Sequence, residues 1–167
     1  MPSRLRGRTV AGVHVIEVRP VPYDAPESEA LIAAALADLA ERYDGDGDAT
    51  PVAATEFSPP DGAFCVARVG DQVAGCGGWR SHPVQERTAE IKRMYTVPGW
   101  RGNGVASAVL RALEASARAA GMRRVILETG VRQPEAIALY KRSGYVEIEK
   151  YGYYRDSPES VCYGRHL

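Results

Sequence analysis

Two closely spaced glycines stand between an extended segment of the chain and a long amphipathic one. Gly102 and Gly104 lie in Val-Pro-Gly-Trp-Arg-Gly-Asn-Gly-Val-Ala (97–106), which leads into the helical periodicity of residues 105–120. Exposed backbone N–H groups at a helix N-terminus attract anions, and Arg101 adds a full positive charge. The segment therefore predicts a strand that turns directly into a helix, with a pyrophosphate site at the turn.

Two common nucleotide-binding loops do not fit this segment. A dinucleotide-binding loop needs a third glycine in Gly-x-Gly-x-x-Gly and an acidic residue about 20 residues later. Here Ser107 occupies the third position, and Arg123 and Arg124 stand near the place of the acid. The Gly-Lys-Ser/Thr of a Walker loop is also absent. The predicted anion site therefore belongs to another class of ligand.

The rest of the chain alternates between short apolar segments and amphipathic ones, which indicates a mixed α/β (α+β) fold. Gly70 and Asp71 separate two of the apolar segments and predict a tight hairpin. Gly75, Gly77 and Gly78 follow in the second of these segments and predict a bulge or a close approach of two backbones. We expect one domain over residues 1–167, with strands over 13–18, 63–69, 72–79, 89–96, 124–129, 145–151 and 160–165 and helices over 27–43, 105–120 and 134–142.

Composition narrows the function classes. A hydrophobic content of 45% and a charged content of 25% are typical of soluble globular proteins. Twenty-one basic residues cancel 21 acidic ones, which argues against DNA binding. No apolar run approaches the roughly 7–15 residues of a signal core or the roughly 20 of a membrane span, so we expect a cytoplasmic protein without membrane attachment. Cys65, Cys76 and Cys162 are expected to be small core residues in strands, because their spacing fits neither disulfides nor a metal.

The charges are unevenly distributed along the chain. Residues 22–61 hold ten acids and one base, whereas residues 92–124 hold seven bases and one acid. This pattern predicts a basic anion site beside an acidic lip that favours a cationic partner. The acidic run at 44–48 is similar to the start of a calcium loop, but Ala49 and Thr55 stand where that loop needs Gly and Glu. Calcium is therefore excluded, and a flexible acidic loop is expected.

Two segments resemble the signature motifs of one enzyme family. Arg-Gly-Asn-Gly-Val-Ala (101–106) matches the Arg/Gln-x-x-Gly-x-Gly/Ala motif of the GCN5-related N-acetyltransferases, the GNAT superfamily. Ala-Ile-Ala-Leu-Tyr-Lys-Arg-Ser-Gly-Tyr (136–145) is similar to the Ala-x-x-Leu-Tyr-x-x-x-Gly-Phe/Tyr helix of that family. The resemblance implies a GNAT fold, with a mostly antiparallel mixed sheet of about six to seven strands flanked by helices. It also implies a wedge where the strand at 89–96 splays from the strand at 124–129.

The resemblance further implies that acetyl-CoA lies in this wedge as the acetyl donor, without a metal. An amine-bearing small molecule or peptide would be its partner, and dimers are common among similar proteins. Gln133 stands where family members usually carry Asn to hold the cofactor, so that contact departs from the pattern. The resemblance implies two further groups of cofactor-binding residues. These are Met94, Tyr95 and Thr96 for the pantetheine arm, and Arg101, Gly102, Asn103, Gly104, Val105, Ala106 and Ser107 for the pyrophosphate.

Acetyl transfer to an amine needs a neutral nucleophile, a polarised thioester carbonyl and a proton for the departing thiolate. Tyr140 is similar in position to the general acid of the family, and a phenol with an ordinary pKa near 10 suits a thiolate leaving group. Backbone N–H groups beside Met94 are expected to polarise the carbonyl. Tyr153 and Tyr154 are expected to line the acceptor pocket, together with the helix at 27–43 and its acidic loop, because acids and ring faces suit an ammonium group.

The general base has two candidates, Glu90 and Glu128, which stand where different branches of the family place a catalytic glutamate. Glu90 is slightly favoured, and a water chain to either is a further route. Two other functions stay open: a non-catalytic acyl-CoA-binding or regulatory domain, and a toxin-like acetyltransferase that acts on aminoacyl-tRNA. The structural alternative for both glutamates is an ion pair with Lys92, Arg93 or Arg132.

Overall fold

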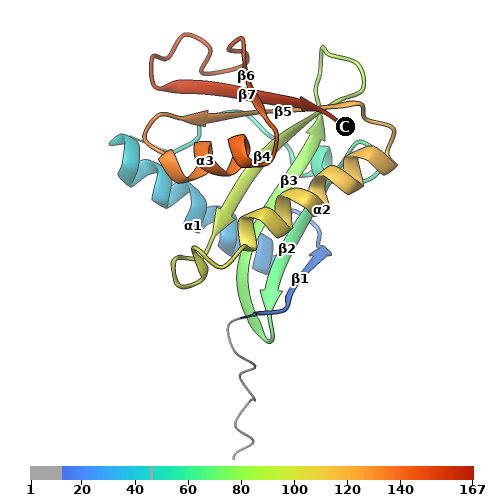
Figure 1. The fold of residues 1–167 in the computed structure, drawn as a ribbon, viewed down its shortest axis with the longest axis vertical. Helices are drawn as coiled ribbons and strands as arrows, with labels where there is room; N and C mark the ends of the chain where they lie inside the picture. Colours follow the sequence, from blue (N-terminus) through green and yellow to red (C-terminus); the bar gives the residue numbers. More distant parts are fainter. Residues whose placement is uncertain (1–12, 46) are drawn as a thin grey trace, which may run out of the picture.

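The computed structural model describes residues 13–45 and 47–167 (Figure 1). Ten strands and α-helices follow one another along the chain, and two short 3₁₀ helices, Ala54–Phe57 and Pro98–Trp100, lie between them. The strands are β1 Ile16–Pro20, β2 Gly62–Val69, β3 Gln72–Ser81, β4 Thr88–Thr96, β5 Arg124–Gly130, β6 Val146–Ile148 and β7 Ser160–His166. The α-helices are α1 Pro26–Tyr43, α2 Val105–Ala119 and α3 Pro134–Arg142.

The seven strands form one mixed sheet in the order β1-β2-β3-β4-β5-β7-β6. Every neighbouring pair is antiparallel except β4 and β5, which are parallel. The parallel pairing covers only Thr88–Ile91 against Arg124–Leu127. Beyond these residues the two strands separate, which confirms the mostly antiparallel sheet with a splayed wedge.

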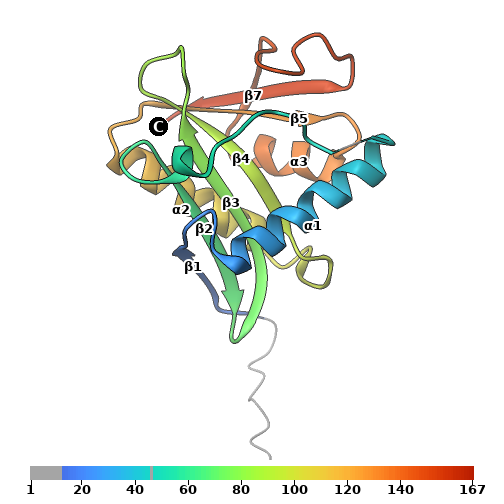
Figure 2. The same ribbon diagram turned by 180° about the vertical axis from the view of Figure 1, so that it is seen from behind.

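Helices cover both faces of the sheet. Helices α2 and α3 lie on one face, and α1 crosses the other (Figures 1 and 2). The core under α2 and α3 contains Trp79, Leu113 and Leu127, whereas the core under α1 contains Ile32 and Phe64. Since alternate residues of a strand point to opposite faces, β4 and β5 each send side chains into both layers.

Two strands are shorter than the sequence predicts. The first strand begins at Ile16 rather than at residue 13, because Ile16 pairs with Val69, the last residue of β2, and residues 13–15 have no partner strand in the described ranges. Strand β6 contains three residues of the expected 145–151, because Tyr145 is drawn into the core and β7 pairs with β6 only as far as Ile148. No helix in the described ranges is sufficiently long and apolar to cross a membrane.

Candidate active site

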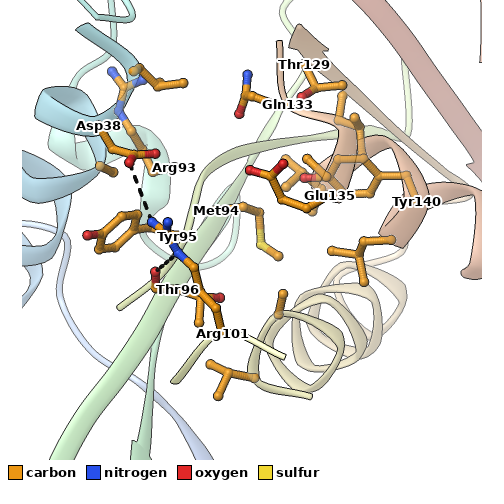
Figure 3. A pocket seen from close by; sticks show the side chains of 18 of the residues that line it. Asp38, Arg93, Met94, Tyr95, Thr96, Arg101, Thr129, Gln133, Glu135 and Tyr140 are labelled. Carbon is orange, nitrogen blue, oxygen red and sulfur yellow. Dashed lines mark hydrogen bonds and ion pairs between the residues drawn. The ribbon is translucent and has the colours of Figure 1, made fainter. Parts of the chain in front are cut away.

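A cleft of about 610 Å³ occupies the space where β4 and β5 separate, with walls from all three α-helices. Figure 3 shows Met94, Tyr95 and Thr96 of β4 on one side of this cleft and Thr129, Glu135 and Tyr140 on the other. The predicted site residues that line it are Met94, Tyr95, Thr96, Arg101, Gly102, Gly104, Val105, Ala106, Ser107, Glu128, Gln133 and Tyr140. Asn103 and Glu90 lie outside this lining.

A bulge in β4 shapes the wall of the cleft. Cys76 pairs with Tyr95 and Gly78 pairs with Lys92, so the single residue Gly77 of β3 faces two residues of β4, Arg93 and Met94. Arg93 has φ +60°, a left-handed conformation that non-glycine residues rarely adopt. A Cβ at Gly75 would lie 2.6 Å from the carbonyl oxygen of Tyr95, so the close approach of two backbones predicted from the glycines is present, and a Cβ at Gly77 would lie 2.6 Å from Met94 Sδ. The bulge turns the backbone of β4 at the level of Met94.

The N-terminus of α2 meets the other end of the cleft. Gly102 and Gly104 have φ values of +77° and +85°, and Gly104 is the N-cap residue of the helix. The N–H groups of residues 102–107 donate to no backbone carbonyl within the described part of the chain. Unpaired N–H groups and the helix dipole favour a negative charge here, so the anion site stays a prediction at this end of α2. Asn103 contributes its amide to the loop itself, donating to the carbonyl oxygens of Trp100 and Arg101.

Arg101 is held at the edge of the cleft by its own neighbours. Its Nε donates to the carbonyl oxygen of Thr96 over 3.2 Å, and its guanidinium lies 5.8 Å from the ring centre of Tyr95. Asp38 of α1 pairs with it at 3.6 Å (Figure 3). Asp38 therefore offsets part of the positive charge that Arg101 brings to this edge of the cleft.

The C-terminal end of α1 is joined to the start of α3 across the wedge. Arg42 pairs with Asp38 at 3.1 Å and with Glu135 of α3 at 2.5 Å. Gln133, the residue that replaces the usual Asn, donates from Nε2 to the hydroxyl of Tyr43 over 3.2 Å. Its amide is therefore engaged with α1, although Gln133 also lines the cleft.

Tyr140 lies on α3, where the sequence motif places it, and is only 5% exposed. Burial raises the pKa of its phenol well above the ordinary value of 10, so the group is protonated at neutral pH. The ring packs 5.7 Å from that of Tyr145, whose hydroxyl donates to Glu114 of α2 over 2.9 Å. Tyr140 thus presents a fixed, protonated hydroxyl group beside the cleft.

Glu90 and Glu128 have different surroundings. Arg80 stands opposite Glu90 in the β3–β4 register and pairs with it at 2.8 Å, with both side chains almost completely buried. Burial raises the pKa of Glu128 from its ordinary value of 4.5 to about 7, an effect that nearby Lys92 partly offsets. No cation of residues 13–45 and 47–167 lies within ion-pair distance of Glu128. The structural alternative for Glu90, an ion pair, is therefore present, but its partner is Arg80 rather than Lys92, Arg93 or Arg132.

A second, smaller cavity of about 90 Å³ opens next to the cleft on the α1 side of the sheet. Its lining consists of Thr50, Arg80, His82, Pro83, Glu90, Lys92, Glu128, Tyr151, Gly152 and Tyr153. Lys92 and Glu128 line the cleft as well, so they stand at the junction of the two cavities. Tyr153 lines this cavity, and its role in acceptor binding stays a prediction, whereas Tyr154 lies in neither lining and binds the acidic loop, accepting from the N–H of Ala49 over 2.7 Å.

The architecture has close counterparts among known proteins. A family model described as the acetyltransferase (GNAT) family matches residues 30–145. The chain belongs to the acetyltransferase (GNAT) family. A GNAT wedge is therefore the setting of the cleft, as the sequence motifs predicted.

Several relatives match over part of their length. An "IAA acetyltransferase" of Azospirillum brasilense is 37% identical over 105 residues, covering 63% of this chain and 68% of that protein. An "aminoglycoside N(6')-acetyltransferase type 1" of Stenotrophomonas maltophilia is 36% identical over 78 residues, covering 47% of this chain and 48% of that protein. For relatives such as the latter, the match spans about half of the other protein.

Solved GNAT structures match nearly the whole chain. A Klebsiella pneumoniae protein assigned as an acyl-CoA N-acyltransferase is 31% identical with a TM-score of 0.75, covering 91% of this chain and 97% of that one. A GNAT acetyltransferase from Elizabethkingia anophelis, solved with acetyl-CoA bound, has a TM-score of 0.65 over 91% of this chain and 98% of that one. The Elizabethkingia protein is 17% identical to this chain, so this similarity shows that the two share a fold and nothing more.

A charged cluster in this GNAT site was not predicted from the sequence. Asp48, from the acidic loop after α1, pairs with Arg93 at 2.5 Å and with Lys92 at 3.4 Å. Burial alone would raise the pKa of Asp48, but Lys92, Thr50 and Arg93 lower it below its ordinary value. The hairpin register would have revealed Arg80 opposite Glu90, whereas no local pattern places Asp48 here.

The three cysteines match the expectation of small core residues. All are free and buried, and burial raises the thiol pKa of Cys65 to about 11 and that of Cys76 to about 12. Their thiols are therefore protonated at neutral pH and poor nucleophiles. Within the two described ranges, no group of three or more His, Cys, Asp or Glu side chains could hold a metal ion.

Proposed function

We propose that the protein is an N-acetyltransferase that moves the acetyl group of acetyl-CoA to a primary amine of a small molecule or peptide, by direct attack in a ternary complex. The observation that best supports this proposal is that one cleft brings together the free N-terminus of α2, the β4 bulge, Glu128 and Tyr140. A non-catalytic acyl-CoA-binding domain would need the first of these features alone. The names of the relatives mention different acceptors, so they support the reaction class and leave the acceptor open.

The residues present fit acetyl-CoA as the donor. The N–H groups of residues 102–107 and the guanidinium of Arg101 offer donors and positive charge to its pyrophosphate. Strand β4 is free of β5 beyond Ile91, so Met94, Tyr95 and Thr96 can pair with the amide groups of the pantetheine arm. The bulge at Arg93 and Met94 directs backbone N–H groups to the thioester carbonyl in this proposal.

Glu128 is the better general base of the two candidates. A carboxylate with a pKa of about 7 is half ionised at neutral pH and can accept the proton that an ammonium group must lose. Glu90 is already neutralised by Arg80 at 2.8 Å. We therefore assign proton removal to Glu128 and a supporting position to Glu90, which reverses the slight preference drawn from the sequence.

Tyr140 is the proposed general acid. The amine nitrogen attacks the thioester carbon, its N–H proton passes to Glu128, and a C–N bond forms. The C–S bond then breaks with its electron pair on sulfur, and the thiolate takes the proton of the Tyr140 hydroxyl. Burial keeps the phenol protonated until the thiolate forms, although the raised pKa makes it a weaker acid than an ordinary phenol, and the phenolate then regains a proton from solvent.

The test is the release of CoA thiol from acetyl-CoA across pools of amino acids, polyamines, aminoglycosides and short peptides. We expect release in at least one pool and a loss of about 10²-fold in kcat for Tyr140→Phe with unchanged affinity for acetyl-CoA. Lys141→Met, an exposed change next to Tyr140 on α3, is the matched control. Tight binding of acetyl-CoA without thiol release in any pool would favour the non-catalytic alternative.

A further inference from the structure

Lys92 and Glu128 occupy equivalent places on two neighbouring strands. Ile91 of β4 and Leu127 of β5 form the last pair before the strands separate. Lys92 and Glu128 follow directly, so they are the first residues beyond the parting point. Both line the cleft and the small cavity, which places an ammonium group and a carboxyl group at the passage between donor and acceptor sides.

The other charges around the small cavity compensate one another. Arg80 pairs with Glu90 at 2.8 Å, and Arg93 holds Asp48 at 2.5 Å. Lys92 has a single partner in the described ranges, the same Asp48, at the longer distance of 3.4 Å. Its side chain is only 8% exposed, and its ammonium group has three N–H donors. Lys92 is thus a cation with one loosely held partner, and Glu128 has no ion-pair partner in the described ranges.

Such a combination selects for a ligand that carries both charges. A buried charge is costly unless a close opposite charge compensates it. An acceptor with an ammonium group alone would offer a partner to Glu128 but would be repelled by Lys92. An acceptor with a carboxylate near its amino group compensates both residues. Polyamines and aminoglycosides, which carry several positive charges and no carboxylate, fit this passage poorly.

We infer that the acceptor is a small amine bearing a carboxylate close to its amino group, as in an amino acid, with Lys92 binding the carboxylate. This inference rests on the proposed function for the role of Glu128 and adds the chemical class of the substrate. The small cavity, at about 90 Å³ against about 610 Å³ for the cleft, suits a compact acceptor. Lys92 is then a specificity-determining residue that touches the acceptor away from the reacting nitrogen.

The deciding experiment compares each amino acid with its own amide as acceptor, for alanine, serine and glycine, under the same acetyl-CoA concentration. Amidation removes the carboxylate and leaves the amine in place. Because it also lowers the pKa of the amine and so increases the reactive neutral form, chemical reactivity alone would favour the amide. We expect the wild-type protein to prefer the acid over the amide by at least about tenfold in kcat/KM.

Two substitutions at Lys92 sharpen the result. Lys92→Met removes the charge and keeps the length, so the preference for the acid should fall to near unity, mostly through KM. Lys92→Arg keeps the charge and should retain part of the preference. Lys141→Met on the exposed face of α3 should behave as wild type.

Each outcome separates this inference from the proposed function. Equal or better acetylation of the amides by the wild-type protein would overturn the inference and leave the acetyltransferase function intact. If neither the amino acids nor their amides cause release of CoA thiol, the broader amine pools decide the proposed function, and thermal stabilisation of the protein by amino acids in the presence of CoA decides the inference. Stabilisation by the acids but not by their amides would support it, and the absence of that difference would reject it.

Discussion

Arg80 and Glu90 face each other across β3 and β4 and form an ion pair of 2.8 Å, with side chains that are 11% and 6% exposed. Glu128 lies on β5, the other neighbour of β4, and has no ion-pair partner in the described ranges. Burial raises its pKa to about 7. Two glutamates of the same site are therefore held in different ways. Glu128 can therefore exchange a proton near neutral pH, whereas the carboxyl group of Glu90 is bound to Arg80.

The activity should depend on the ionisation of Glu128. A general base acts in its deprotonated form, so kcat/KM of the wild-type protein should fall as the pH drops below about 7. Glu128→Gln should lose about 10²-fold in kcat and lose this acid limb, as measured by CoA release between pH 5.5 and 9. An unchanged acid limb in Glu128→Gln, together with its loss in Glu90→Gln, would move the role of base to Glu90.

The same carboxyl group should shape the stability of the protein. Its pKa is higher in the folded state than the ordinary 4.5, so the folded state binds more protons than the unfolded state between about pH 4.5 and 7. The contribution of Glu128 to the free energy of unfolding therefore declines as the pH rises through this window and is constant above it. Glu128→Gln should raise Tm more at pH 8 than at pH 5.

Denaturation at the two pH values checks this expectation. Glu147→Gln, an exposed carboxyl change on β6, serves as the control and should show no difference between the two conditions. If Glu128→Gln lowered Tm at pH 8, the ionised carboxylate would be a stabilising group, contrary to its surroundings here.

Gly77 should tolerate no side chain. A Cβ there would lie 2.6 Å from Met94 Sδ and 2.9 Å from Val109 Cγ1, so Gly77→Ala must displace Met94 or α2. We expect a loss of about 1–3 kcal/mol in the free energy of unfolding and a higher KM for acetyl-CoA, because Met94 lines the cleft. Gly99→Ala, where a Cβ would meet nothing within 4 Å, is the matched control for thermal and kinetic measurements.

Asp38 should weaken the binding of CoA. It pairs with Arg101 at 3.6 Å and brings a negative charge to a cleft that is proposed to receive a pyrophosphate. Asp38→Asn should strengthen CoA binding by about two- to fivefold, since exposed ion pairs of this kind contribute less than about 1 kcal/mol. Calorimetric titration at low and high salt would compare the affinity of Asp38→Asn and of the wild-type protein for CoA. The exposed Asp71→Asn is the control. Weaker binding by Asp38→Asn would show instead that Asp38 positions Arg101 for the ligand.

The fold was largely predictable because its signals are local. The glycines at 102 and 104 require positive φ at the start of α2, and both do have it. The alternation of apolar residues gave the strands of the hairpin within two residues of their ends. Strand ends that depend on a partner, such as those of β1 and β6, were misjudged, because pairing with β2 and β7 decides them.

The electrostatics of the site were less predictable. Asp48 reaches Lys92 and Arg93 from 44 and 45 residues away, and no periodicity reports such a contact. The bulge lies at Arg93, a residue type that carries no turn signal, although Gly77 opposite it did. Which glutamate is paired depends on the register of β3 and β4, so the sequence treated Glu90 and Glu128 almost alike.

The short parallel pairing of β4 with β5 joins two half-sheets, β1–β4 and β5–β7–β6, through only four residue pairs. Met94 lies on the first half-sheet and Glu128 on the second, and both line the cleft between them. Ala89 and Ile126 belong to the four pairs that join the half-sheets, and both are fully buried. A larger or smaller side chain at either residue is expected to change the separation of β4 and β5 at the cleft, although neither residue lines it. The volumes of these two side chains are therefore expected to influence the width of the cleft in which acetyl transfer is proposed.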